Sequence, residues 1–457
     1  MTRFGSLADA PASLLIHGAR VVDPATGTDA AADLAIHDGE FVSPSALPAD
    51  AVRVDANGLV AIPALCDLHA HLREPGAEAS ETIESGARAA AHGGYATVCA
   101  MPNTNPPLDE PARVAWVAAR AVDAACRVRV VAAATRGRAG EAFTDLRELA
   151  ALGIAGVSDD GTAVASAPVA RSLLAYLAPL GLPLIEHAEE AGLAEGTVMR
   201  GGAVATRLGL AAWPASAELI VVERDIALAA ETGGWVHLTH LSTSAALGAV
   251  RRAKEAGVRV TCDVTPHHLA LTDAWVAGDR RFAWEEPGDP GSPLDPSRAY
   301  DGACRVNPPL GTRDDALALL AGVADGTVDA IATDHAPHPA ERKLVEFAAA
   351  APGMIGLETA LSLGLAAVAA GCLSLLALVA AMATNPARLI GERRAIEPGA
   401  TADLVLVDPS AAWRVEREVL ASASANTPLL GRELPGVVRL TLASGRVTYA
   451  NGIDGLD

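Results

Sequence analysis

Short apolar runs alternate with longer alanine-rich segments through most of this 457-residue chain. The apolar runs end at Gly, Pro, Asp or Asn and are typical of buried strands, and the segments between them have helical character. The predicted strands are 59–68, 95–100, 127–134, 153–158, 182–187, 235–240, 258–263 and 328–333. The clearest predicted helices are 80–92, 108–124, 213–231, 243–256 and 312–324. This α/β alternation predicts a (β/α)₈ TIM-like barrel, whose active site lies at the carboxyl ends of the strands.

The two ends of the chain have a different pattern, with short strands and no helices between them. Residues 13–55 contain short apolar runs separated by Asp, Gly and Pro, and residues 402–449 have the same character. We expect both ends to form one small, discontinuous β-sandwich domain. Its two parts are predicted at residues 1–57 and 393–457, with the barrel at 58–392 inserted between them.

Composition narrows the choice of partners and compartment. A net charge of −20 argues against nucleic acid, because phosphate binding needs clustered Lys and Arg. Six cysteines without Cys-x-x-Cys spacing indicate buried thiols in a cytoplasmic protein, and residues 1–12 lack the pattern of a signal peptide. Residues 359–384 carry no charge and are long enough to cross a bilayer, but Gly371 and Ser374 interrupt them. We therefore expect two packed helices there and no membrane partner, and we expect 278–302 to be an irregular surface loop.

Metal-binding side chains stand where the predicted strands end. His69 and His71 point to one face of their strand, because side chains alternate along a strand, and such a pair can reach one metal ion. An isolated His-x-His is as often a packing pair. The other strands lead into Asn103, Asp159, Asp160, His187, His237, His240, His267, His268, Asp334 and His335. Such a set on one rim suits a binuclear zinc site, in which a shared water is activated and a carboxylate moves the proton.

Several motifs in this set resemble those of class I dihydroorotases in the amidohydrolase superfamily. They are Asp67-x-His69-x-His71-x-Arg73-x-Pro75-Gly76, Met101-Pro102-Asn103-Thr104, Ser158-Asp159-Asp160-Gly161, His240-Leu241-Ser242-Thr243, Asn307-Pro308-Pro309-Leu310 and Asp334-His335-Ala336-Pro337-His338. The resemblance spans the whole chain. It implies zinc-dependent, reversible cyclisation of N-carbamoyl-L-aspartate to L-dihydroorotate, a step of de novo pyrimidine (UMP) biosynthesis. Whether the chain forms a homodimer or associates with aspartate transcarbamoylase stays open.

The resemblance also implies two zinc ions per subunit and the residues that bind each of them. The ligands are His69, His71 and Asp334 for one ion and His187 and His240 for the other. Many superfamily members bridge the two metals with a carboxylated lysine, but Lys254 and Lys343 do not lie near strand four. The match gives the bridge to Asp160, with Asp159 as the alternative. Asp334 would also be the catalytic acid and base that exchanges a proton with the ring nitrogen.

The substrate contacts that the resemblance implies are Arg73, Asn103, Asn307, His338, Pro352 and Gly353. A planar guanidinium such as Arg73 suits the α-carboxylate of the substrate. The other histidines are expected to have supporting roles. His17, His37, His92 and His237 are expected to be structural, His267 and His268 to support the site, and His335 to point away from Asp334.

Two other functions stay open from the sequence. A related cyclic amidase, a hydantoinase or allantoinase, is disfavoured by the missing strand-four lysine and by Arg73 with Asn103, which suit an acidic substrate. An inactive homologue that only acts as a scaffold for aspartate transcarbamoylase is disfavoured because every expected ligand position is filled. Zinc content and the choice of substrate separate the three.

Overall fold

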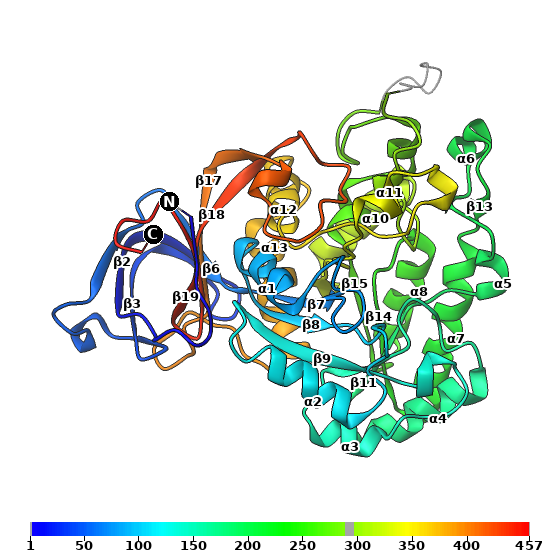
Figure 1. Cartoon of the computed structure of the whole chain (residues 1–457), viewed down its shortest axis with the longest axis horizontal. Helices are drawn as coiled ribbons and strands as arrows, with labels where there is room; N and C mark the ends of the chain where they lie inside the picture. Colours follow the sequence, from blue (N-terminus) through cyan, green and yellow to red (C-terminus); the bar gives the residue numbers. More distant parts are fainter. Residues whose placement is uncertain (1, 288–296, 457) are drawn as a thin grey trace.

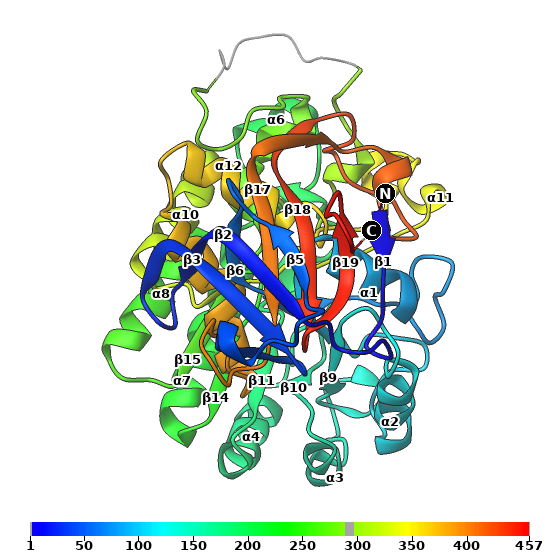
Figure 2. The same cartoon turned by 90° about the vertical axis from the view of Figure 1, so that its left-hand side faces the viewer.

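A barrel surrounded by helices lies beside a sheet that is built from both ends of the chain (Figure 1). The structure, a computed structural model, describes residues 2–287 and 297–456. The N- and C-terminal ends of the chain lie close together at the outer sheet, as Figure 2 shows.

Eight parallel strands form the barrel and pair in chain order. They are β7 (Leu65–Ala70), β8 (Tyr95–Ala100), β9 (Arg127–Ala133), β10 (Gly156–Ser158), β11 (Pro183–Glu186), β14 (Trp235–Leu238), β15 (Val260–Val264) and β16 (Ala330–Ile331). The barrel closes through an isolated parallel bridge between Ala70 at the end of β7 and His335, four residues beyond β16. The expected (β/α)₈ barrel is thereby confirmed, although most strands are shorter than the apolar runs that predicted them.

Helices follow most of these strands and cover the outside of the barrel (Figure 1). The longer ones are α1 (Ile83–His92), α2 (Pro111–Arg120), α4 (Ala167–Leu177), α7 (Ser216–Thr232), α8 (Ser244–Glu255), α10 (Arg313–Asp325) and α12 (Ala360–Ala369). The shorter ones are α3 (Leu146–Ala151), α5 (Ala191–Ala194), α6 (Ala203–Leu208), α9 (Pro266–Ala270), α11 (Ala340–Lys343), α13 (Leu375–Val379) and α14 (Asn385–Leu389). Polar caps begin several helices: Thr82 and Thr312 each form a reciprocal capping box with the residue three positions on.

The outer sheet has nine strands. Six come from the N-terminal part: β1 (Thr2–Phe4), β2 (Leu14–Asp23), β3 (Thr28–His37), β4 (Glu40–Val42), β5 (Val52–Asp55) and β6 (Val60–Pro63). Three come from the C-terminal part: β17 (Leu404–Arg414), β18 (Glu433–Ala443) and β19 (Arg446–Asn451). β17 pairs with β6, and β1 pairs with β19, so both ends of the chain do form one β unit. The two short strands β12 (Met199–Arg200) and β13 (Ala212–Trp213) form a separate ribbon.

The predicted strand 59–68 is wrong as one element. Its first half is β6, which pairs with β2 and β17 of the outer sheet, and only its second half is barrel strand β7. Ala64 alone separates the two strands. Both halves are buried on both faces, so one apolar run contains two strands. The outer sheet thus extends to Pro63, whereas the domain limits at 57/58 and 392/393 stay a prediction.

Two further predictions concern residues 359–384 and the loop 278–302. Residues 359–384 contain α12 and α13, separated by a turn at Gly371, which confirms two packed helices. Across residues 2–287 and 297–456, no helix is both long and apolar enough to cross a membrane. The predicted loop 278–302 is irregular at 278–287 and 297–301, and its residues 288–296 lie outside the described residues.

Candidate metal centre

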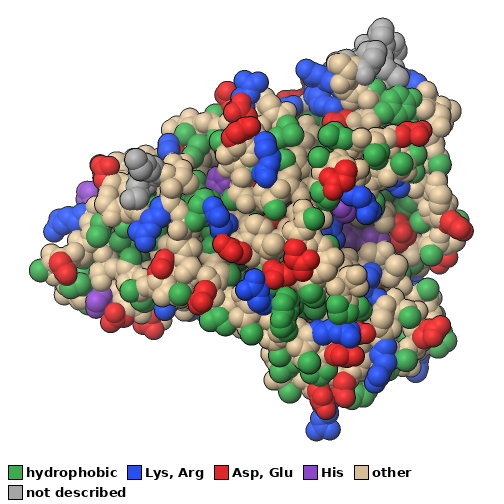
Figure 3. Space-filling view, in the orientation of Figure 1, with side chains coloured by type: hydrophobic (Ala, Val, Ile, Leu, Met, Phe, Trp, Pro, Cys, Tyr) green, Lys and Arg blue, Asp and Glu red, His purple; other side chains and the backbone are tan. Residues whose placement is uncertain are grey.

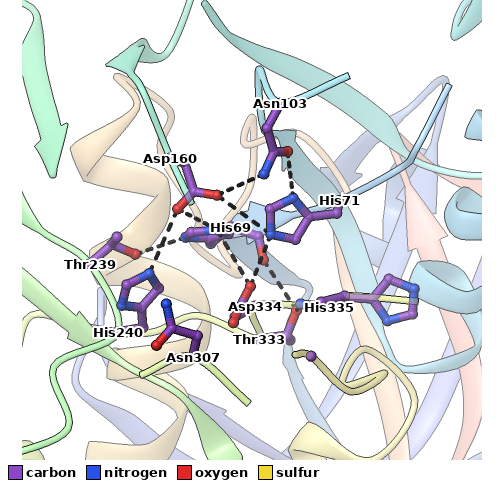
Figure 4. Close-up of polar contacts among 12 residues, drawn as sticks. His69, His71, Asn103, Asp160, Thr239, His240, Asn307, Thr333, Asp334 and His335 are labelled. Carbon is purple, nitrogen blue, oxygen red and sulfur yellow. Dashed lines mark hydrogen bonds and ion pairs between the residues drawn. The ribbon is translucent and has the colours of Figure 1, made fainter. Parts of the chain in front are cut away.

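The side chains expected to bind metal lie at the carboxyl ends of the barrel strands, and Figure 4 shows five of them together: His69, His71, Asp160, His240 and Asp334. They come from five strand ends, and all six residues are buried: His69, His71, Asp160, His187, His240 and Asp334. Figure 3 shows histidine side chains at the bottom of a hollow on one face of the molecule. Sequence positions up to 265 residues apart, from His69 to Asp334, are therefore brought to one rim.

His69, His71 and Asp334 form the first group. Oδ1 of Asp334 lies 3.5 Å from Nε2 of His69 and 3.1 Å from Nε2 of His71. Ligand atoms about 2.1 Å from a tetrahedral zinc ion lie about 3.4 Å from one another. These two distances match that spacing, and all three atoms lie within 4.8 Å of one another, so they could hold one ion.

Asp160 faces the first group and also the two remaining histidines. Its Oδ1 lies 3.4 Å from Nε2 of His69, 3.7 Å from Nε2 of His240 and 3.9 Å from Nδ1 of His187. Its Oδ2 lies 3.6 Å from Nε2 of His71. A carboxylate in this position can contact two ions at once.

Asp159 lies next in the chain but makes other contacts. Its carboxylate accepts hydrogen bonds from the backbone amide and the hydroxyl of Thr135. Lys254 bonds to Asp329 and the carbonyl of Thr327, and Lys343 to three backbone carbonyls, so both lysines are engaged elsewhere. The geometry therefore favours Asp160 over Asp159 as the bridge.

His187 and His240 point their ligand nitrogens toward each other, with Nδ1 of His187 3.0 Å from Nε2 of His240. His240 shares a group of convergent side-chain atoms with His69 and Asp160, whereas His187 falls outside that group and contacts it at 3.9 Å from Oδ1 of Asp160. The other ring nitrogen of His187, Nε2, lies 3.3 Å from the Asn307 amide and 3.8 Å from Glu189. Nδ1 is therefore the nitrogen that His187 presents to the cluster.

Two buried atoms of the cluster lack any hydrogen-bond partner, Nε2 of His69 and Oδ1 of Asp160. Buried polar atoms are almost always satisfied, so a pair of orphans that face each other calls for a further group between them. A divalent cation fits, because imidazole nitrogens and carboxylate oxygens are the ligands of zinc.

The pKa shifts of the buried groups in the cluster also favour a bound cation. Burial raises the pKa of Asp160, but His69 and His240 outweigh it and hold the pKa well below its ordinary value. Burial lowers the pKa of His69, but Asp160 and Asp334 outweigh it and raise the pKa to about 10. Two buried carboxylates thus require positive charge beside them, which a proton on His69 supplies and a metal ion would replace.

Hydrogen bonds on the far side of the rings fix which nitrogen faces the cluster. Nδ1 of His69 bonds to Oγ1 of Thr239 at 2.9 Å, and Nδ1 of His71 bonds to Oδ1 of Asn103 at 2.8 Å (Figure 4). Both Nε2 atoms are therefore directed inward. The Asn103 amide also donates to Oδ2 of Asp160 at 3.2 Å, so Asn103, an expected substrate contact, lies against two of the ligand residues.

The other expected substrate residues surround this cluster. Arg73, at a φ of 58°, donates from Nε to the carbonyl of Pro337, and Nε2 of His338 donates to the carbonyl of Pro352. Burial and then the nearby Arg73 lower the pKa of His338 to about 3, so its ring is neutral. A cavity of about 130 Å³ opens between Asn307 and Pro352.

Sequence reasoning missed two residues that hold the backbone around Gly353. The buried Lys343 ammonium donates to the carbonyls of Arg305, Ala351 and Gly353 at 2.7 to 3.1 Å. Asn426 donates to the Gly353 carbonyl at 3.1 Å and accepts from the backbone amide of His338 at 3.0 Å. Lys343 could have been noticed as one of only two lysines, whereas no sequence signal marks Asn426.

The histidines outside the ligand set make other contacts. His335 turns away from the cluster and bonds to Glu81 at 3.2 Å (Figure 4). His237 bonds to Asp263, and His268 bonds to Thr265 and to the carbonyl of Pro308. His267 is buried, and its Nε2 lacks a hydrogen-bond partner. The last three lie in the outer sheet or against it, namely His17, His37 and His92, and pair with Asp33, Ser13 and Glu358 respectively.

In sequence, the chain is similar to known dihydroorotases. A family model described as "Dihydro-orotase-like" matches residues 58–246. A dihydroorotase of Pelobacter propionicus is 42% identical over 442 residues, which cover 96% of this chain and 99% of the relative. A dihydroorotase of Anaeromyxobacter sp. (strain K) is 45% identical over 444 residues, covering 96% and 98%.

Solved structures with the same fold carry other names. An L-hydantoinase (dihydropyrimidinase) from Arthrobacter aurescens superposes with a TM-score of 0.81 at 21% identity, covering 95% of each chain. A dihydropyrimidinase from Brevibacillus agri has a TM-score of 0.78 at 22% identity, covering 96% of this chain and 95% of that one. At this level of identity the likeness shows the fold alone.

Proposed function

We propose that this chain, which belongs to the dihydroorotase family, catalyses the zinc-dependent, reversible cyclisation of N-carbamoyl-L-aspartate to L-dihydroorotate. The chain is a cyclic amide hydrolase that acts on a small molecule, as its curated dihydroorotase relatives over 96% of its length are. The observation that carries the proposal is the convergence of three histidines and two aspartates, with His187 beside them and orphaned buried atoms at the centre.

We assign two zinc ions to this centre. His69, His71 and Asp334 would hold one ion and His187 and His240 the other, with Asp160 between them. When bound, two such ions lower the pKa of a shared water and polarise the carbonyl of the substrate. The Nε2 atoms of His69 and His71 that face the carboxylates of Asp160 and Asp334 support this assignment.

Asp334 is the proposed acid and base. Its Oδ1 faces both histidines of the first group, which leaves Oδ2 to exchange a proton with the ring nitrogen during cyclisation and ring opening. The surrounding histidines hold its pKa below the ordinary value although burial opposes them, so it enters hydrolysis as a carboxylate and can accept the proton.

Arg73 is the proposed anchor of the substrate's α-carboxylate, and Asn103, Asn307, His338 and the backbone at Pro352 and Gly353 complete the pocket. Arg73→Lys is expected to raise KM for L-dihydroorotate about 10-fold or more, because a point charge replaces a planar fork and a charge-assisted hydrogen bond of ~1.5–3 kcal/mol is lost. Zinc content should stay at the wild-type value. Steady-state kinetics together with metal analysis check this, and an unchanged KM would remove Arg73 from the substrate pocket.

The equilibrium of the reaction should depend on pH. Cyclisation turns the dianion of N-carbamoyl-L-aspartate into the monoanion of L-dihydroorotate and therefore consumes one proton. The ratio of dihydroorotate to carbamoyl-aspartate at equilibrium should fall about 10-fold for each unit that the pH rises. Measuring this ratio from both directions at three pH values checks the substrate assignment, and a ratio that is independent of pH contradicts it.

The deciding experiment compares L-dihydroorotate with hydantoin and allantoin on protein whose zinc has been quantified. We expect turnover of dihydroorotate with about two zinc ions per chain. Zinc with turnover of the other rings alone would assign a hydantoinase or allantoinase activity. A protein without zinc and without turnover would instead be an inactive scaffold for aspartate transcarbamoylase.

A further inference from the structure

We propose that Asp263 is a positioning residue shared by both metal-binding groups, acting on His69 through the hydroxyl of Thr239 and on His240 through its backbone amide. The inference rests on the proposed function in one respect, that the histidines bind metal. Asp263 lies in β15, next to the strand that leads to Thr239 and His240, and its side chain is fully buried.

The Asp263 carboxylate is surrounded by donors. Its Oδ1 accepts from the backbone amide of His240 at 2.6 Å, and its Oδ2 lies 2.8 Å from Nε2 of His237. The hydroxyl of Thr239 lies 3.2 Å from Oδ1 and 3.0 Å from Oδ2. A backbone amide can only donate, so the carboxylate acts as acceptor in this group of contacts.

The direction of these bonds determines the tautomer of His69. Thr239 has a single hydroxyl hydrogen, which it gives to Asp263. Oγ1 of Thr239 then accepts from Nδ1 of His69, 2.9 Å away, so the ring carries its proton on Nδ1. Nε2 faces Asp160 and Asp334 at 3.4 and 3.5 Å, so it is the nitrogen that would lose its proton to a metal ion while Nδ1 keeps its own.

The second branch acts on the backbone of His240. This residue has a φ of 42°, in the left-handed region that non-glycine residues seldom adopt. The bond from its amide to Asp263 holds that conformation, and the conformation directs the imidazole toward His187 and Asp160. Asp263 thereby supports one ligand of each proposed ion.

The other two histidine ligands depend on different partners. Nδ1 of His71 bonds to Asn103, and Nε2 of His187 faces Asn307 and Glu189. A change at Thr239 should therefore affect the ion bound by His69, whereas a change at Asp263 should affect both ions.

The test measures zinc affinity by competition with a chromophoric chelator. Thr239→Val removes the hydroxyl and should weaken one of the two ions about 10- to 100-fold, the usual effect of losing an outer partner of a metal ligand. Thr239→Ser keeps the hydroxyl and should bind both ions as the wild type does. Asp263→Asn cannot accept from all its donors and should weaken both ions. Thermal unfolding of the metal-free proteins monitors the fold.

A folded Thr239→Val protein that binds both ions with wild-type affinity overturns the inference. If the variants fail to fold, ¹⁵N NMR of the histidine rings in the zinc-loaded wild type gives the answer. A proton on Nδ1 of His69 supports the proposed action of Asp263 through Thr239, and an unprotonated Nδ1 overturns it. Failure of the proposed function gives different results. Wild-type protein that binds zinc without turning over dihydroorotate contradicts that function alone, and wild-type protein that binds no zinc contradicts both.

Discussion

Asp160→Ala is expected to lower the affinity for zinc by more than ~100-fold and to abolish measurable turnover of L-dihydroorotate, because an outer partner alone is worth up to that much. The Asp160 carboxylate lies within 4 Å of a ring nitrogen of each of the four histidines that are proposed as ligands. Its removal leaves both ions without a shared ligand. Metal analysis after dialysis and a turnover assay measure the two effects.

Asp159→Ala is the matched control. It removes a buried carboxylate one residue away that bonds to Thr135, at a cost in stability of ~1–3 kcal/mol, and should leave zinc content at the wild-type level. If Asp159→Ala lost its zinc and Asp160→Ala kept it, the bridging role would belong to Asp159.

Asp334→Asn should separate proton transfer from metal binding. The amide oxygen of asparagine can still face His69 and His71, whereas the amide cannot exchange a proton near neutral pH. We therefore expect most of the zinc to be retained and kcat to fall ~10²- to 10⁴-fold, the usual contribution of a general acid or base. Single-turnover kinetics on protein of known zinc content provide the measurement. A kcat within 10-fold of wild type would assign proton transfer to another group.

The sequence predicts the barrel well because each strand–helix unit is a local pattern. It does not show where one sheet ends and the next begins, because Val60–Pro63 and Leu65–Ala70 are both buried and read as one apolar run. The pairing of β6 with β17 joins residues more than three hundred positions apart, and no local pattern carries that information.

Some features of the site could likewise be predicted from the sequence, whereas others could not. Alternation along β7 places His69 and His71 on one face, and both indeed direct Nε2 at Asp334. The orientation of His240 depends instead on a left-handed backbone and on Asp263, which lies on the neighbouring strand. Asn426 reaches the site from far along the chain, so only the fold reveals it.

The segments that end the first and last strands of the barrel are joined by two main-chain contacts, the bridge between Ala70 and His335 and the bond from the His71 amide to the His335 carbonyl. His69 and His71 stand on one side of this seam and Asp334 on the other. An ion bound by these three residues would therefore link the two sides of the seam and stabilise the closed barrel. Amide hydrogen exchange in β7 and β16 would then report whether the metal is present, even in protein that has never met its substrate.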